Sequence, residues 1–167
     1  MNLPGILLAI AFSVASCVSD LRAADSDVLY EVGKPFKLHL ASDTNLVLCV
    51  ENNLCSWKPT GEGEPVRLKF TRGLADPTQA SLEMADQTNT FLRHFFLRLR
   101  TAAAPARRDP IFEADATFNV QPGSARNSVV LRSFNFRDAF IARTHTGKAY
   151  VTPDAAPDAA EFIISYK

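Results

Sequence analysis

The segments FLRHFFLRLR (residues 91–100) and DATFNVQPG (residues 115–123), joined by a polar spacer, decide the fold. Both contain short runs in which apolar and polar residues alternate, which is the pattern of a half-buried β-strand. Similar runs, separated by Gly, Pro, Asn and Asp, continue from Tyr30 onward, and no long stretch has helical periodicity. The sequence therefore predicts an all-β fold.

The predicted strands form three groups of four, and the groups can be laid over one another. Leu46, Phe91 and Phe140 open the second strands, 45 and 49 residues apart, and a phenylalanine recurs in the fourth strands, 48 and 44 residues apart. Three four-stranded units of about 45 residues predict a β-trefoil with pseudo-threefold symmetry. The repeats are expected at about residues 34–76, 77–125 and 126–167. The strands are predicted at residues 36–40, 46–50, 55–58, 66–70, 80–84, 90–93, 96–100, 116–120, 128–133, 139–143, 148–152 and 161–165.

Residues 1–24 are predicted to be a signal peptide. Residues 5–18 are apolar and rich in small side chains, and they are too short and wrongly flanked for a membrane span. The mature domain, residues 25–167, is therefore expected to be secreted. Residues 14–17 also resemble a lipoprotein cleavage box, which would place a lipid anchor on Cys17. Plain secretion is favoured, because the segment before the apolar run contains no Lys or Arg.

The mature chain would keep two cysteines, Cys49 and Cys55. In an oxidising compartment this pair predicts a local disulfide, which would stabilise the fold by about 2 kcal/mol in the chain-entropy model. A metal site would need more ligands at suitable spacing, and no His or Cys cluster is nearby. The pair is therefore expected to be structural, with no metal and no cofactor.

The charge of the chain argues against nucleic acid as a partner. The 18 basic and 18 acidic residues cancel, whereas phosphate binding depends on clustered positive charge. Five arginines between residues 93 and 108 form a local basic group. Alternating Leu and Arg is ordinary strand patterning, so this group is interpreted as a solvated strand face and loop.

Four segments carry a family resemblance: GLADPTQASLE, FLRHFFLRLR, DATFNVQPG and LRSFNFRDAFIAR. They resemble the arabinose-binding domain of alpha-L-arabinofuranosidase B, a β-trefoil carbohydrate-binding module of family 42. The resemblance covers the chain from about Phe36 to the C-terminus. It implies binding of arabinofuranose side chains on arabinan or arabinoxylan. It also implies that His94, in the Leu-Arg-His motif, and Asp115, before Thr-Phe, help to hold the sugar.

The same motif is weaker in the third repeat and poor in the first. In the third repeat Arg143 falls where the histidine belongs, His145 follows two residues later, and Asp158 precedes its phenylalanine by four residues instead of three. A shift of one residue reverses the face of a strand, so a second sugar site there is a weaker prediction. Its candidate residues are His145, Asp158 and Phe136. In the first repeat Cys49 and Arg67 occupy the two positions, which suggests a disulfide in place of a sugar site.

The residue types at the middle motif suit a sugar. An ionised aspartate can accept hydrogen bonds from two hydroxyls, a histidine adds a donor or acceptor beside it, and an aromatic face covers the ring carbons. Phe95 is the first candidate for that face, with Phe96, Phe134 and Phe136 also available. Core packing is the alternative role for these phenylalanines.

The chain is not expected to be an enzyme. A glycosidase needs two carboxylates flanking the bond, and the acidic residues offer no recognisable pair. No G-x-S-x-G, H-E-x-x-H or Gly-rich phosphate loop is present either. The predicted function is thus a secreted, non-catalytic arabinofuranose-binding module. A secreted β-trefoil that binds or inhibits a protein is the main alternative, and an arabinofuranosidase with an unrecognised site is the third.

Overall fold

The computed structural model describes residues 29–166, so the predicted signal peptide and Cys17 lie outside the described residues. The regular structure of the described chain is twelve β-strands and two short helices, which confirms the predicted all-β class. Its strands are β1 (Lys37–Leu40), β2 (Asp43–Glu51), β3 (Leu54–Pro59), β4 (Leu68–Arg72), β5 (Ala80–Met84), β6 (Thr90–Phe95), β7 (Arg98–Ala103), β8 (Thr117–Pro122), β9 (Ser128–Ser133), β10 (Phe140–Arg143), β11 (Ala149–Thr152) and β12 (Glu161–Ser165). Two short helices, α1 (Pro110–Asp115) and α2 (Pro157–Ala160), precede β8 and β12.

Six of the strands close into a barrel. Antiparallel pairing runs from β1 to β12, β9, β8, β5 and β4 in turn. The ring closes where Phe36, just before β1, bridges to Leu68 in β4, with backbone N–H···O distances of 2.7 and 2.9 Å. A closed ring leaves no free sheet edge among these strands.

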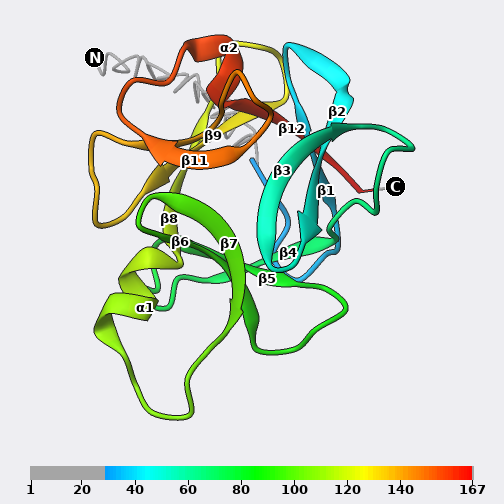
Figure 1. Cartoon of the computed structure of the whole chain (residues 1–167). Helices are drawn as coiled ribbons and strands as arrows, with labels where there is room; N and C mark the ends of the chain where they lie inside the picture. Colours follow the sequence, from blue (N-terminus) through cyan, green and yellow to red (C-terminus); the bar gives the residue numbers. More distant parts are fainter. Residues whose placement is uncertain (1–28, 167) are drawn as a thin grey trace, which may run out of the picture.

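The other six strands form three hairpins, β2–β3, β6–β7 and β10–β11, which Figure 1 shows arranged around the middle of the molecule. The hairpins contact one another through single pairs: Leu54 with Arg100, Arg98 with Tyr150, and Ser56 with Lys148. Each repeat therefore supplies two barrel strands and one hairpin, which is the strand arrangement of a β-trefoil.

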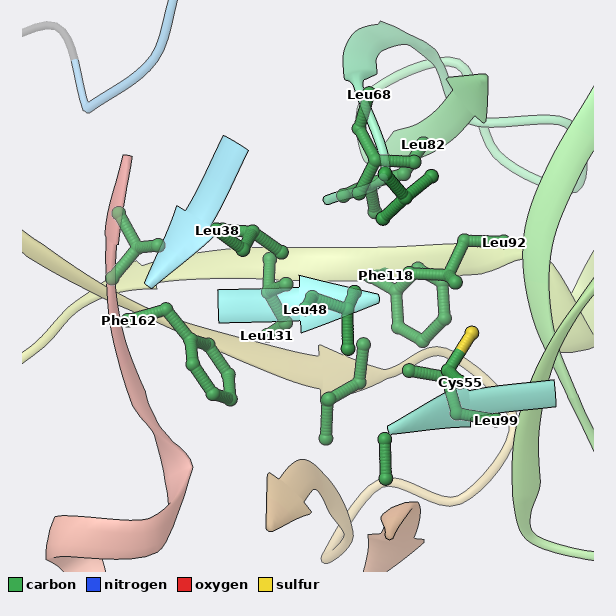
Figure 2. Close-up of a cluster of buried hydrophobic side chains, with 14 of the residues drawn as sticks. Leu38, Leu48, Cys55, Leu68, Leu82, Leu92, Leu99, Phe118, Leu131 and Phe162 are labelled. Carbon is green, nitrogen blue, oxygen red and sulfur yellow. The ribbon is translucent and has the colours of Figure 1, made fainter. Parts of the chain in front are cut away.

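The core is built from equivalent side chains of the three units, and Figure 2 shows it as one continuous apolar cluster. One set comes from the first strands, another from the hairpins and a third from the fourth strands. All of these side chains are completely buried: Leu38, Leu82 and Leu131; Leu48, Leu92 and Ile141; and Phe70, Phe118 and Phe162. The hairpin set is spaced by 44 and 49 residues. Leu48 of the first repeat therefore corresponds to Leu92, and Val47 corresponds to Phe91. The sequence had aligned Leu46 with Phe91, which is wrong by one residue.

The predicted disulfide is wrong: Cys49 and Cys55 are both buried free thiols. In the β2–β3 hairpin, Cys49 pairs with Ser56, whereas Cys55 pairs with Val50. Successive strand residues point to opposite faces, so the two cysteines project from opposite sides of the hairpin. Cys55 lies in the apolar core, while the sulfur of Cys49 lies outside that cluster, close to Gly63. Opposed Cβ directions cannot be bridged without moving the backbone.

Burial controls the reactivity of both thiols. It raises the pKa of Cys55 to about 12, and it also raises the pKa of Cys49. Since the thiolate is the reactive form, we expect both residues to resist alkylation in the folded protein and to react promptly in denaturant without reductant. Mass spectrometry of the peptides containing Cys49 and Cys55 reads this directly. If neither cysteine is alkylated in denaturant and the linked peptides are lighter by two hydrogens than the two free thiols, a disulfide is present instead.

Glu161, at the start of β12, forms hydrogen bonds to the turn between β8 and β9. Its carboxylate accepts hydrogen bonds from the backbone N–H groups of Ser124 and Ala125, at 2.9 and 3.1 Å, and from Ser128 Oγ at 3.1 Å. These bonds favour the ionised form and lower the pKa of Glu161, the bond from Ser124 contributing most. The carboxylate therefore serves as the hydrogen-bond acceptor for the backbone N–H groups of Ser124 and Ala125.

Replacing Glu161 with glutamine is expected to change the acid sensitivity of the fold. Because the pKa is lower in the folded chain than in the unfolded one, the stabilisation is present above the ordinary value of 4.5 and is lost as the pH falls through the folded value. We expect Glu161→Gln to lower the free energy of unfolding by about 1–2 kcal/mol at neutral pH. Urea titrations between about pH 6 and pH 3 should show a smaller acid-induced loss in the variant than in the wild type. Parallel losses in both proteins would contradict this role.

Candidate functional site

One pocket gathers the polar residues of the middle repeat. It has a volume of about 490 Å³ and is lined by Arg93, His94, Phe95, Phe96, Leu97, Ile111, Asp115, Asn135 and Phe136. Three segments form it: the β6–β7 hairpin, helix α1, and the turn between β9 and β10. Figure 1 shows α1 lying next to β6, and so explains why residues far apart in sequence meet here. The pocket is thus shared between the middle repeat and the start of the third.

The carboxylate of Asp115 is the centre of the pocket floor. Arg93 Nη2 lies 2.5 Å from one carboxylate oxygen, and Asn135 Nδ2 donates to the other at 2.8 Å. Asp115 is 6% exposed. A buried carboxylate with a guanidinium partner and an amide donor is held in one orientation, and its remaining lone pairs can still accept hydrogen bonds.

His94 lies against the same carboxylate and is buried beside it. Its Nε2 is 2.9 Å from Asn135 Oδ1 and 3.4 Å from Asp115 Oδ1. Asn135 donates its amide to Asp115, so its carbonyl oxygen faces His94, and Nε2 of the imidazole must carry the hydrogen. Ser133 Oγ also donates to Asn135 Oδ1, at 2.9 Å. Asn135 therefore fixes the tautomer of His94 and the position of Asp115 together.

Helix α1 delivers Asp115 to the floor, although no helix was predicted at this position. Asp109 caps the helix by accepting from the N–H groups of Ile111 and Phe112, at 3.0 and 3.2 Å, and Pro110 occupies the first helical position. The helix has six residues, which is too short to show a helical period. The Asp-Pro pair was the available signal for it.

Arg93 and Asn135 are the functional residues that sequence reasoning missed. Arg93 was interpreted as part of a solvated basic face, but its side chain is 13% exposed and is paired with Asp115. Its guanidinium also lies over the rings of Phe112 and Phe95, at 4.8 and 5.3 Å from their centroids. Strand alternation alone cannot show that a helix will cover this face of β6. Asn135 belongs to a polar turn of the third repeat, so no signal within the middle repeat could identify it.

Phe136 lies in the middle pocket, for which it was one of the candidate aromatic side chains, and not in a third-repeat site with His145 and Asp158. Its ring packs edge-on against His94, with 5.2 Å between the ring centroids. Together with Phe95, it places an aromatic side chain at the mouth of the pocket. The reason is topological, because the β9–β10 turn of the third repeat completes the site of the second.

The remaining third-repeat candidates, His145 and Asp158, are not brought together. Both are exposed; His145 lies in the turn after β10, and Asp158 lies in α2. Asp158 contributes its backbone carbonyl to Ser42 Oγ, at 2.7 Å. Arg143 occupies the strand position that corresponds to His94, as the sequence alignment predicted, and Ala159 corresponds to Asp115. The predicted pair therefore does not form a floor like that of the middle repeat.

The first repeat has an ion pair where the middle repeat has its carboxylate floor. Val50, and not the predicted Cys49, corresponds to His94, because Val50 pairs with Cys55 as His94 pairs with Leu99. Val50 and Arg67 line a smaller pocket of about 230 Å³. Arg67 Nη1 lies 3.2 Å from Asp86 Oδ1. This ion pair crosses the junction between the first and second repeats, which corresponds to the junction at the middle pocket. This pocket lacks both predicted sugar-binding side chains.

A family model for the alpha-L-arabinofuranosidase B (ABFB) domain matches residues 42–162, which include the whole pocket. The chain belongs to the ABFB domain family. This membership confirms the resemblance seen in the sequence. No curated protein matches the chain.

Solved structures share the fold of this ABFB domain. A GH54 α-L-arabinofuranosidase soaked with a cyclic sulfate inhibitor has a TM-score of 0.69 and 18% identity, covering 83% of this chain and 32% of that one. An arabinofuranosidase complexed with arabinofuranosyl-α-1,2-xylobiose gives 0.68 and 18%, covering 81% and 31%. Gallus interleukin-1 beta gives 0.62 and 14%, covering 81% and 97%. The ABFB domain thus spans about a third of the length of the two arabinofuranosidases.

Proposed function

We propose that this ABFB domain is an exported, non-catalytic module that binds the arabinofuranose side chains of polysaccharides such as arabinan and arabinoxylan. The observation that carries the proposal is the joint placement of Asp115, His94 and Asn135 on the floor of one pocket bordered by aromatic rings. Family membership supports a carbohydrate as the ligand class. Export rests on the sequence of residues 1–24. Within residues 29–166, no helix has the length and apolar character needed to cross a membrane.

The floor suits a small polyol better than a charged or apolar ligand. Asp115 can accept from sugar hydroxyls, and the guanidinium of Arg93 neutralises its charge, so the floor presents polar groups without a net charge. Arg93 retains N–H groups beyond the one bound to Asp115, and these can donate to a ring or hydroxyl oxygen. The rings of Phe95 and Phe136 are placed to cover the carbon face of a five-membered sugar.

The floor lacks the groups that hydrolysis of a glycoside requires. Glycosidases use two carboxylates on opposite sides of the bond. Among the described residues that line this pocket, Asp115 is the one carboxylate, and it is already paired with Arg93. The nearby Glu113 lies outside the lining and pairs with Arg108 at 3.1 Å. A binding role therefore fits the pocket better than a catalytic one.

One intact pocket implies weak binding. A dissociation constant of about 1 mM corresponds to a binding free energy of about −4 kcal/mol, and we expect a single pentose pocket to bind in this range. A second functional pocket on the same polymer would raise the apparent affinity through effective concentration. The first and third repeats lack the Asp–His floor, so high avidity would require a partner module or display of several copies.

Titration with methyl α-L-arabinofuranoside, followed by NMR chemical shifts or calorimetry, tests the proposal. We expect saturable binding in the millimolar range, and a loss of at least about tenfold in Asp115→Asn and His94→Ala, because each removes a hydrogen bond from a buried polar floor. Arg67→Ala is the matched control, since Arg67 occupies the corresponding place in the first repeat. Methyl β-D-xylopyranoside should bind much more weakly.

Two results would count against a sugar pocket here. Wild-type protein could fail to respond to the arabinofuranoside, or both floor variants, Asp115→Asn and His94→Ala, could bind it with unchanged affinity. Release of free arabinose from a polymer would instead support the enzymatic alternative.

A further inference from the structure

The mouth of the pocket gathers most of the large apolar side chains that the described chain exposes. Seven large apolar side chains of the described chain are substantially exposed, and five of them line this one pocket. We call these five the apolar rim: Phe95 (45% exposed), Phe96 (86%), Leu97 (37%), Ile111 (71%) and Phe136 (47%). Apolar groups concentrated around one pocket, and rare elsewhere on a surface, indicate a binding surface.

The backbone beneath the rim adopts a conformation that its side chains disfavour. Phe96 and Leu97 form the two-residue turn of the β6–β7 hairpin, and both have left-handed backbones, with φ of 47° and 63°. The corresponding turn of the first repeat has nearly the same angles, 49° and 64°, but uses Asn52 and Asn53. Asparagine and glycine are the residues that such turns prefer, whereas bulky residues are strained there.

The middle repeat therefore gives up favourable turn chemistry to place two apolar side chains beside the floor. Strain of this kind persists where the surrounding structure enforces it and is concentrated at functional sites. The enforcement is visible here: Leu97 O accepts from Val151 N at 2.8 Å, and Arg98 pairs with Tyr150. Strand β11 thus holds the turn in place, so the rim is preformed and does not need to be ordered by a ligand.

We propose that the preferred ligand is an α-L-arabinofuranoside whose aglycone is aromatic; this rests on the proposed function. The floor is buried and the rim is exposed, so a terminal sugar seated on Asp115 directs its glycosidic bond outward, past Phe96 and Ile111. A hydroxyl-rich polysaccharide backbone can keep its hydroxyls in water at this position, and so it gains little from the rim. An aromatic group would instead bury its ring against the rim, and the volume of about 490 Å³ lies within the range of about 300–1,000 Å³ that accepts such amphipathic ligands.

The test compares methyl and 4-nitrophenyl α-L-arabinofuranoside on the same protein. We expect the wild type to bind the nitrophenyl glycoside about tenfold more tightly, the effect of burying one side of an aromatic ring. In Phe96→Asn/Leu97→Gly, which restores the preferred turn chemistry, the ratio of the two dissociation constants should fall close to one. Leu54→Asn is the matched control: it removes an exposed apolar side chain from another hairpin, outside the pocket, and should keep the tenfold ratio.

The outcomes separate this inference from the proposed function. If the wild type binds both glycosides equally well, the aromatic preference is wrong while the sugar site stands; if it binds neither, the sugar site itself fails.

The double variant should also unfold at a higher temperature than the wild type, since the strain is relieved. Unfolding at a lower temperature would mean that the two side chains serve packing, which overturns the inference. Concentration-dependent self-association that the double variant abolishes would assign the rim to a second copy of the chain, and would overturn it too.

Discussion

Asp115→Ala is expected to lower the free energy of unfolding by about 3 kcal/mol, in addition to abolishing sugar binding. The substitution removes the partner of the Arg93 guanidinium, which is 13% exposed and would remain charged without an anion beside it. It also leaves the amide of Asn135 without its acceptor. Removing one member of a buried pair costs more than removing both, because an uncompensated charge remains. Urea unfolding followed by tryptophan fluorescence gives the measurement.

The double variant Arg93→Met/Asp115→Leu is the control for this prediction. It removes both charges and replaces them with apolar side chains of similar length, so we expect it to recover most of the lost stability while remaining unable to bind the sugar. If Asp115→Ala unfolds like the wild type, the ion pair contributes nothing to folding. If the double variant is less stable than Asp115→Ala, packing and not charge governs the floor.

Phe118→Ala is expected to cost about 3–5 kcal/mol, which is a large part of the stability of a domain of this size. Phe118 is completely buried in the shared core of the three repeats, among the side chains shown in Figure 2. Its removal leaves a cavity that the surrounding barrel strands cannot fill without moving. Denaturant unfolding should show a lower midpoint with an unchanged slope. Leu54→Ala, at an exposed hairpin position, should change stability by less than about 0.5 kcal/mol, and equal losses would contradict the assignment of the core.

The sequence was sufficient for the fold because period-two patterning repeats three times. Phe70, Phe118 and Phe162 recur at the same place in each unit, and the structure buries all three completely. The hairpin alignment was one residue wrong in the first repeat, because Leu46, and not Val47, was aligned with Phe91. Two adjacent apolar residues leave the strand register undetermined, and only the observed pairing of Val50 with Cys55 fixes it.

The predicted disulfide rested on the expected export and on the closeness of two cysteines along the chain. Sequence spacing shows that Cys49 and Cys55 are close along the chain, but the hairpin turn decides whether they share a face. With a two-residue turn at Asn52 and Asn53, Cys49 pairs with Ser56, and the two thiols point apart. A turn with one more or one fewer residue would have changed that relation.

Half of the pocket floor could be predicted and half could not. His94 and Asp115 came from a motif within one repeat, and the structure places them side by side. Asn135 comes from the next repeat, and Arg93 becomes buried only because α1 covers it, so both depend on contacts between units. The sequence motif of a single repeat therefore identifies only some of the residues of a site that lies between two repeats.

The most direct test of the central proposal is affinity electrophoresis of the mature protein in gels containing arabinoxylan, arabinan or unsubstituted xylan. The pocket predicts that the first two polymers slow the wild type and that unsubstituted xylan, which has no arabinofuranose branches, does not. The same gels should not slow His94→Ala or Asp115→Asn, whereas Arg67→Ala should migrate like the wild type. Equal retardation by branched and unbranched xylan, or retardation that survives both floor substitutions, would contradict recognition of arabinofuranose by this pocket.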